Sequence, residues 1–128
     1  SAPSWLDAAA TELESARTAL KSGHQRKGVA FSRRAAGMAV NALLIIQPSE
    51  AYGRSYLEHL RALGTDENVP QAVKHAAGAL LEAREDAPSL VKIGGGGDEG
   101  LADAACTICE WCETAVHGVL QAMMTGGG

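Results

Sequence analysis

The feature that most constrains the fold of this chain is the spacing of its apolar residues, which recur every three or four positions in several segments. Such spacing places the apolar side chains on one face of an α-helix. No segment of any length shows the strict alternation of apolar and polar residues that a half-buried strand requires. The chain is also rich in alanine, the strongest helix former. The sequence therefore predicts an all-α fold.

Glycine and proline divide the first part of the chain into two helices. Ser4 is expected to begin the first helix, and Gly23 is expected to end it, because glycine tolerates the left-handed conformation that often follows a helix. The second helix is predicted over about residues 25–46. It ends before Pro48, since the residue that precedes a proline avoids the α conformation.

Three further helices are predicted after the loop at residues 47–53. The third is short and ends at Gly64, and its leucines recur every three residues at Leu57, Leu60 and Leu63. The fourth begins at Pro70, because proline suits the first turn of a helix, and it frays near residues 86–88. Asp98 is expected to cap the fifth helix, and a disordered glycine tail is expected at residues 126–128.

At 128 residues the chain is long enough for one domain with a continuous core, so residues 1–128 are predicted to form a single domain. Amphipathic helices with short connections favour an up-and-down bundle, here of four long helices plus one short helix. Aromatic residues are few, so the core is expected to consist of Leu, Ala, Val and Ile. The apolar stripes of the second and fifth helices are wider than one seam requires, which predicts a symmetric homodimer.

Three cysteines are too few for a disulfide framework, and no signal-peptide pattern opens the chain. The longest apolar run, residues 35–46, is shorter than a membrane-spanning helix. A cytoplasmic protein without a membrane partner is therefore expected.

Two motifs lack the sequence surroundings that a metal site or a phosphate site needs. Cys106, Cys109 and Cys112 have the spacing of part of an iron–sulfur run, but their flanks are helical, and buried cysteines are common in helical cores. The glycine run at residues 94–97 lacks the Lys-Ser/Thr pair of a phosphate-binding loop and is interpreted as a linker. We therefore expect no metal site and no cofactor.

The charge distribution is uneven, although the net charge is only −4. No acidic residue occurs between Glu14 and Glu50, whereas this stretch holds Arg17, Lys21, Arg26, Lys27, Arg33 and Arg34. Such a stretch binds an anion, packs against an oppositely charged partner, or is a solvated helix face. In the first case the predicted ligand-binding residues are Arg26, Lys27, Arg33, Arg34 and Arg54, with Arg54 at the start of the third helix.

Two segments carry a family resemblance. The segment from Val29 to Leu44 resembles the second helix of HEPN domains (higher eukaryotes and prokaryotes nucleotide-binding), in which a polar pair leads into alanine-rich turns that end in Ala-Leu-Leu. The segment from Tyr52 to Leu63 is similar to the Gly/His-containing start of the next helix in these domains. The order of helices along the whole chain also resembles theirs.

The resemblance implies a dimeric helical bundle that binds a nucleotide or RNA, in many members as the partner of a small nucleotidyltransferase. Active members are metal-independent ribonucleases, as in toxin–antitoxin pairs, and their Arg-x4–6-His pattern matches Arg54 and His59 as a catalytic pair. Three functions thus stay open: a binding module, a ribonuclease, or a helical scaffold without a small ligand. His59 lies near the apolar face of its helix, so His59→Ala is expected to lower stability more than binding.

Overall fold

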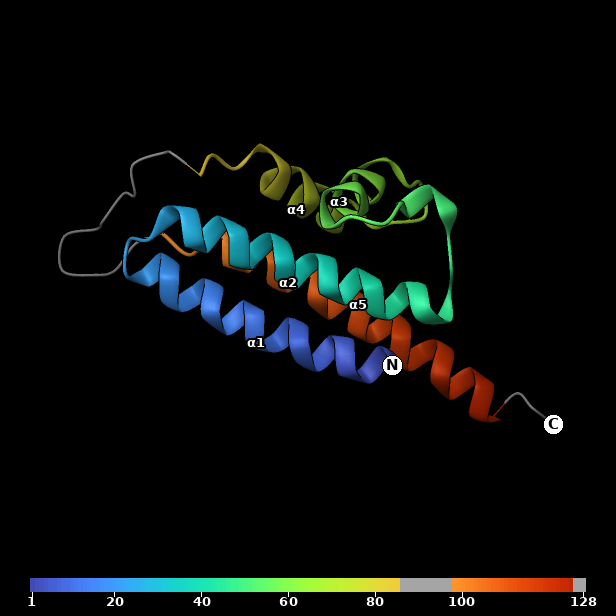
Figure 1. The fold of residues 1–128 in the computed structure, drawn as a ribbon. Coiled ribbons are helices and arrows are strands. Elements are labelled where there is room, and N and C mark those ends of the chain that lie inside the picture. Colours follow the sequence, from blue (N-terminus) through green and yellow to red (C-terminus); the bar gives the residue numbers. More distant parts are fainter. Residues whose placement is uncertain (86–97, 126–128) are drawn as a thin grey trace.

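The computed structural model describes residues 1–85 and 98–125, and in these residues every regular element is a helix (Figure 1). The elements are α1 (Ala2–Lys21), α2 (Gln25–Ile46), the 3-10 turn η1 (Glu50–Tyr52), α3 (Tyr56–Thr65), α4 (Gln71–Glu82) and α5 (Gly100–Thr125). The predicted all-α class is confirmed. The expected fraying near residues 86–88, the glycine linker at 94–97 and the tail at 126–128 lie outside the described residues.

Three long helices form the body of the molecule. α1, α2 and α5 contain 20, 22 and 26 residues and pack along one another, with α1 antiparallel to the other two (Figure 1). α3 and α4 contain only 10 and 12 residues and pack together over α2 and α5. The predicted arrangement of four long helices is therefore not confirmed. The fourth predicted helix is short because α4 ends at Glu82.

The boundaries of α1 and α2 follow the local sequence closely. α1 begins at Ala2, two residues before the predicted start, because the Ser1 hydroxyl caps the helix by accepting a hydrogen bond from the Ser4 backbone N–H at 3.3 Å. Gly23 has a φ of +77° in the turn after α1, as predicted for a helix stop. The predicted bounds of α2 are confirmed.

Small shifts occur in the second half of the chain. α3 continues through Gly64 and ends at Thr65, so the predicted stop is one residue early. Leu60 and Leu63 are buried as the spacing predicts, but Leu57 is exposed. Pro70 is the N-cap of α4 and not its first residue. The Asp98 carboxylate accepts a hydrogen bond from the Gly100 N–H at 2.8 Å, which fits its predicted capping role.

The core is built from small aliphatic side chains, as the composition predicts. Its largest cluster joins α2, α3, α4 and α5 and includes Ala35, Ala39, Val40, Leu60, Leu63, Val73, Ala77, Leu80, Ala105, Ile108 and Cys112. Alanines on α2 allow the neighbouring helices to approach this central helix closely.

By length and composition alone, α2 is apolar enough to cross a membrane, with a mean hydropathy of 1.4 over its most apolar window. The prediction that no stretch is long enough to cross a membrane considered only residues 35–46. The whole of α2, with 22 residues, has the length and the apolar composition that crossing requires. A central helix of a soluble bundle has the same composition, and 44% of this window is buried inside the molecule. The property is therefore only a weak sign of a membrane segment.

Candidate functional site

Arg33, one of the predicted ligand-binding residues, caps the C-terminus of α4. Its Nε donates to the Leu80 carbonyl at 2.9 Å, and its Nη2 donates to the Ala83 carbonyl at 3.0 Å. Its Nη1 forms an ion pair with Glu85 at 3.3 Å. The last carbonyls of a helix lack intrahelical partners, so a guanidinium at this point satisfies them. The Arg33 side chain thus links α2 to the end of α4 through these hydrogen bonds and the ion pair.

Other cations of the acid-free stretch also have acidic partners from elsewhere in the chain. Arg34 pairs with Glu12 of α1 at 3.1 Å and also lies over the Phe31 ring, 5.8 Å from its centroid. Arg26 lies 4.0 Å from Glu85, and Arg17 pairs with Asp103 of α5 at 2.9 Å. The fold thus neutralises much of the positive charge that the sequence concentrates between Glu14 and Glu50.

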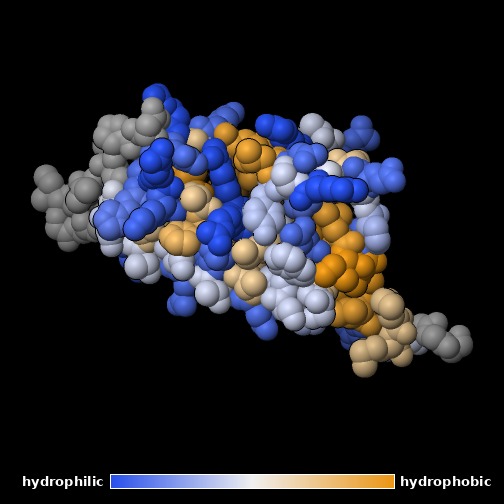
Figure 2. All heavy atoms as spheres, viewed as in Figure 1, coloured by the Kyte–Doolittle hydropathy of each residue, from blue (hydrophilic) through white to orange (hydrophobic). Residues whose placement is uncertain are grey.

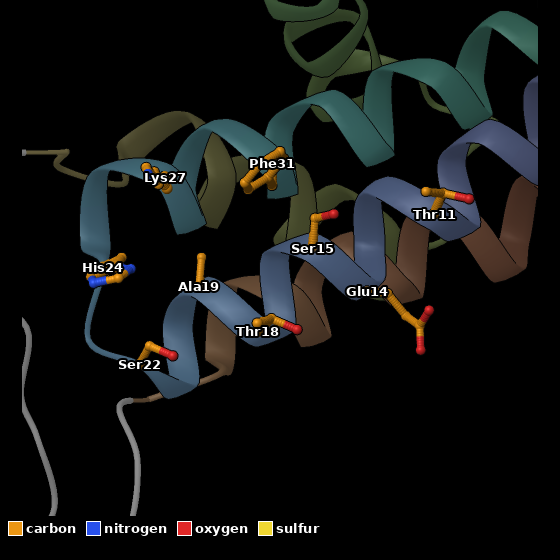
Figure 3. Close-up of a pocket in the computed structure, with 9 residues that line it drawn as sticks. All are labelled: Thr11, Glu14, Ser15, Thr18, Ala19, Ser22, His24, Lys27 and Phe31. Carbon is orange, nitrogen blue, oxygen red and sulfur yellow. The ribbon is translucent and has the colours of Figure 1, made fainter.

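A groove of about 570 Å³ lies between α1 and α2, next to the turn that joins them (Figure 3). Its lining combines a cation, a carboxylate, a histidine, an aromatic ring and a row of hydroxyls. Lys27 forms no ion pair with any described residue. The Phe31 ring points from α2 toward α1, while the Glu14 carboxylate points away from α2 (Figure 3). The hydroxyls belong to α1 and the following turn: Thr11, Ser15, Thr18 and Ser22.

The N-terminus of α2 borders this groove without a capping side chain. His24 is the N-cap residue, its side chain makes no capping hydrogen bond, and the first turn contains no acidic residue. The positive end of the helix dipole is therefore not offset locally. A second hollow of about 310 Å³ lies against the same turn, lined by His24, Gln25, Arg26 and Lys27. Together with the Lys27 ammonium, this end of the groove favours an anion.

Of the five predicted ligand-binding residues, Lys27 alone lines the described groove. Sequence reasoning missed the hydroxyl row, although its signal was present. Thr11, Ser15, Thr18 and Ser22 recur at steps of four, three and four residues, which places them on one face of a helix. A helix face with polar, uncharged groups beside a basic turn is a sequence pattern that points to a polar ligand.

The two residues of the predicted catalytic pair have different surroundings. Arg54 lies before α3 and is exposed, and its side chain forms no ion pair with a described residue. His59 is 1% exposed. Its Nδ1 lies 2.6 Å from the Tyr52 carbonyl oxygen, and its Nε2 lies 2.8 Å from Oδ1 of Asn41. Both ring nitrogens have hydrogen-bond partners inside the molecule, so the ribonuclease hypothesis gains no support from this geometry.

The partners of His59 define its role. A backbone carbonyl can only accept, so Nδ1 carries a hydrogen and donates a hydrogen bond to the Tyr52 carbonyl oxygen. A neutral ring then needs a donor at Nε2, which the Asn41 amide supplies when its NH2 group faces the ring. In either amide orientation, the imidazole joins α2, η1 and α3 through two hydrogen bonds. His59 packs in the core, as its position near the apolar face predicts.

The three cysteines lie along α5 as free thiols. Cys112 is buried in the main core, and Cys109 donates to the Ala35 carbonyl at 3.5 Å. Burial raises the pKa of Cys109 to about 12 and also raises the pKa of Cys112. Metal ligation needs thiolates, which burial of this kind disfavours. Among the described residues, no group of three His, Cys, Asp or Glu side chains is placed to hold a metal ion.

Comparison of the chain with models of protein families, with curated proteins and with solved structures finds no match. The HEPN resemblance therefore stays a prediction, neither supported nor opposed by a relative.

Proposed function

We propose that the protein is a nucleotide-binding module whose site is the groove between α1 and α2. The observation that supports this proposal is the combination of Lys27, which has no ionic partner among the described residues, with an uncapped helix N-terminus at one end of the groove. The volume of about 570 Å³ lies within the usual range for small-ligand sites. A mononucleotide fits this size better than a long RNA.

The groove offers different chemistry at its two ends. A phosphate group would lie at the first turn of α2, where Lys27 and the helix dipole both favour negative charge. Phe31 lies one helical turn further along α2, and its ring would stack against the base. The hydroxyls of Thr11, Ser15 and Thr18 on the opposite wall would then accept or donate hydrogen bonds to the sugar and the base edge.

The Lys27→Ala variant tests this site. Charge-assisted hydrogen bonds contribute about 1.5–3 kcal/mol each, so the variant is expected to weaken nucleotide affinity by about tenfold or more. Isothermal titration with ATP at low salt measures the effect, and affinity should fall as salt is added. Arg61→Ala removes an exposed cation from α3, far from the groove, and should leave the affinity unchanged. Equal affinities for Lys27→Ala and the wild type would contradict the proposal, as would binding of RNA without binding of nucleotide.

The homodimer belongs to the same proposal, and its interface would be the apolar end of the bundle. Ile45, Met123 and Met124 are 48%, 67% and 86% exposed, and Figure 2 shows hydrophobic surface gathered where α2 and α5 end. Residues 35–49 and 114–125 contain no Asp, Glu, Lys or Arg. A membrane-surface helix normally carries basic residues beside its apolar face. An uncharged surface suits a second copy of itself, because no like charges oppose each other.

Ile45→Glu is expected to convert the dimer into a monomer, because each copy would bury an unpaired carboxylate at the interface. Sedimentation of this variant at about 10 μM, a concentration typical of weak dimers, would then give the mass of one chain, 13.2 kDa. Leu57→Glu changes an exposed leucine on α3, outside this end, and should stay dimeric. A monomeric wild type at this concentration would contradict the dimer. A nucleotidyltransferase partner and a cytoplasmic location remain predictions from the sequence.

A further inference from the structure

A second cleft, of about 380 Å³, lies toward the other end of α2 from the turn that joins it to α1. The end of α2, the loop with η1, the connection from α3 to α4, and α5 all contribute to its wall. It shares no lining residue with the groove between α1 and α2. Most of its surface is apolar or aromatic, with Val40, Leu44, Val69 and Trp111 among the lining side chains. The cleft is thus a separate site whose lining is mainly apolar.

The cleft contains one carboxylate and no cation. Asp66 lines it, whereas no Lys, Arg or His among the described residues does. A neighbouring hollow of about 440 Å³ shares Tyr52 and Asp66 with the cleft and adds Glu67. No described basic residue lines this hollow either. An anion entering here would meet the Asp66 and Glu67 carboxylates. The charge of Lys74 helps to lower the pKa of Asp66, but Lys74 lines neither hollow, so the walls disfavour nucleotides and other acids.

Two hydrogen bonds hold the Asp66 carboxylate in place. The Tyr52 hydroxyl donates to Oδ2 at 2.7 Å, and the Asn68 backbone N–H donates to Oδ1 at 2.9 Å. The bond from Tyr52 is the main reason that the pKa of Asp66 is lowered, so the group stays ionised near neutral pH. A carboxylate has about four acceptor positions, which leaves each oxygen able to accept one more bond.

We propose that this cleft binds a small organic amine with an apolar body. The ammonium group would donate to the free acceptor positions of Asp66, and the apolar body would pack against Trp111 and Leu44. A small molecule fits the described walls, because four separate parts of the chain surround a volume near the lower end of the range for ligand sites. The site is independent of the proposed nucleotide groove.

The test compares three ligands of similar shape and different charge: phenethylamine, phenethyl alcohol and phenylpropanoate. Fluorescence of Trp111, followed in a Trp5→Phe background, reports occupancy of the cleft. The amine is expected to bind about tenfold or more tightly than the alcohol, since both can donate a hydrogen bond to Asp66 but only the ammonium adds the attraction of opposite charges. The carboxylate is expected not to bind.

Two variants make the result specific. Asp66→Asn keeps the shape: its amide oxygen can accept from the Asn68 N–H while its NH2 group donates to the Tyr52 hydroxyl oxygen, so the variant should lower the amine affinity to that of the alcohol. Leu44→Phe fills the cleft without changing Asp66 and should abolish binding of both ligands, which covers the case in which Asp66→Asn fails to fold. Asp7→Asn on α1 is the matched control, and Lys27→Ala should also leave amine binding intact.

Several outcomes would overturn the proposal. Equal affinity for the amine and the alcohol would show that charge does not select the ligand. Binding that persists in Leu44→Phe would place the ligand elsewhere. Binding of a lysine-containing peptide without binding of phenethylamine would assign the surface to a protein partner instead.

Discussion

His59→Ala is expected to lower the free energy of unfolding by about 3–4 kcal/mol, from a cavity in the core together with two lost hydrogen bonds. The imidazole is 1% exposed and bonds to the Tyr52 carbonyl and the Asn41 amide. Removing it leaves both partners buried or partly buried without a substitute. Urea unfolding followed by circular dichroism measures the change.

Matched variants show whether the loss of stability is specific to His59 or follows from removing any histidine. His75 of α4 is exposed, so His75→Ala should change stability by less than about 0.5 kcal/mol. Asn41→Ala should couple to His59→Ala, because the two residues share a hydrogen bond; the double variant should therefore cost less than the sum of the single ones. A His59→Ala protein with wild-type stability that has lost RNA cleavage would contradict the structural role and favour the ribonuclease.

Local sequence signals predicted the helices well but not their arrangement. Gly23 and Pro48 bracket α2 because each acts on the backbone of its immediate neighbours. The length of α4 was harder to predict, since its last turns depend on Arg33, which approaches from α2 and holds its final carbonyls. Contacts of this kind join residues nearly fifty positions apart, and no local pattern contains them.

For the candidate site too, the sequence predicted local features but not the contacts between distant segments. The acid-free stretch is a true feature of the sequence, but its partners Glu12, Glu85 and Asp103 lie outside it and reach it only in the folded chain. Counting charges along the sequence therefore overestimates the positive surface. Lys27 forms no ion pair with a described residue and lines the same groove as a row of hydroxyls, and that row was visible in the spacing of the α1 residues.

Gly37 is expected to be the glycine of α2 that tolerates substitution least. The ring of Tyr56, at the start of α3, lies directly on its backbone: a Cβ added at Gly37 would come within 2.3 Å of the ring atoms Cγ and Cδ1, and within 2.6 Å of the Tyr56 Cβ. The ring can rotate, but its Cβ is fixed to the backbone of α3. Any side chain at this position must therefore push α3 away from α2.

Gly37→Ala is accordingly expected to destabilise the protein by about 2–3 kcal/mol through overpacking, although alanine is the better helix former. Gly78→Ala in α4 is the matched control, because nothing lies within 4 Å of the added Cβ. That variant should gain about 0.5–1 kcal/mol from helix propensity alone. The unfolding midpoints of the two variants, measured by heat and by urea, should thus shift in opposite directions.

Stabilisation by Gly37→Ala would show that α3 does not pack on α2 at Tyr56. Tyr56→Ala, which removes the ring but keeps the Cβ, should relieve part of the Gly37→Ala penalty if the contact is the cause.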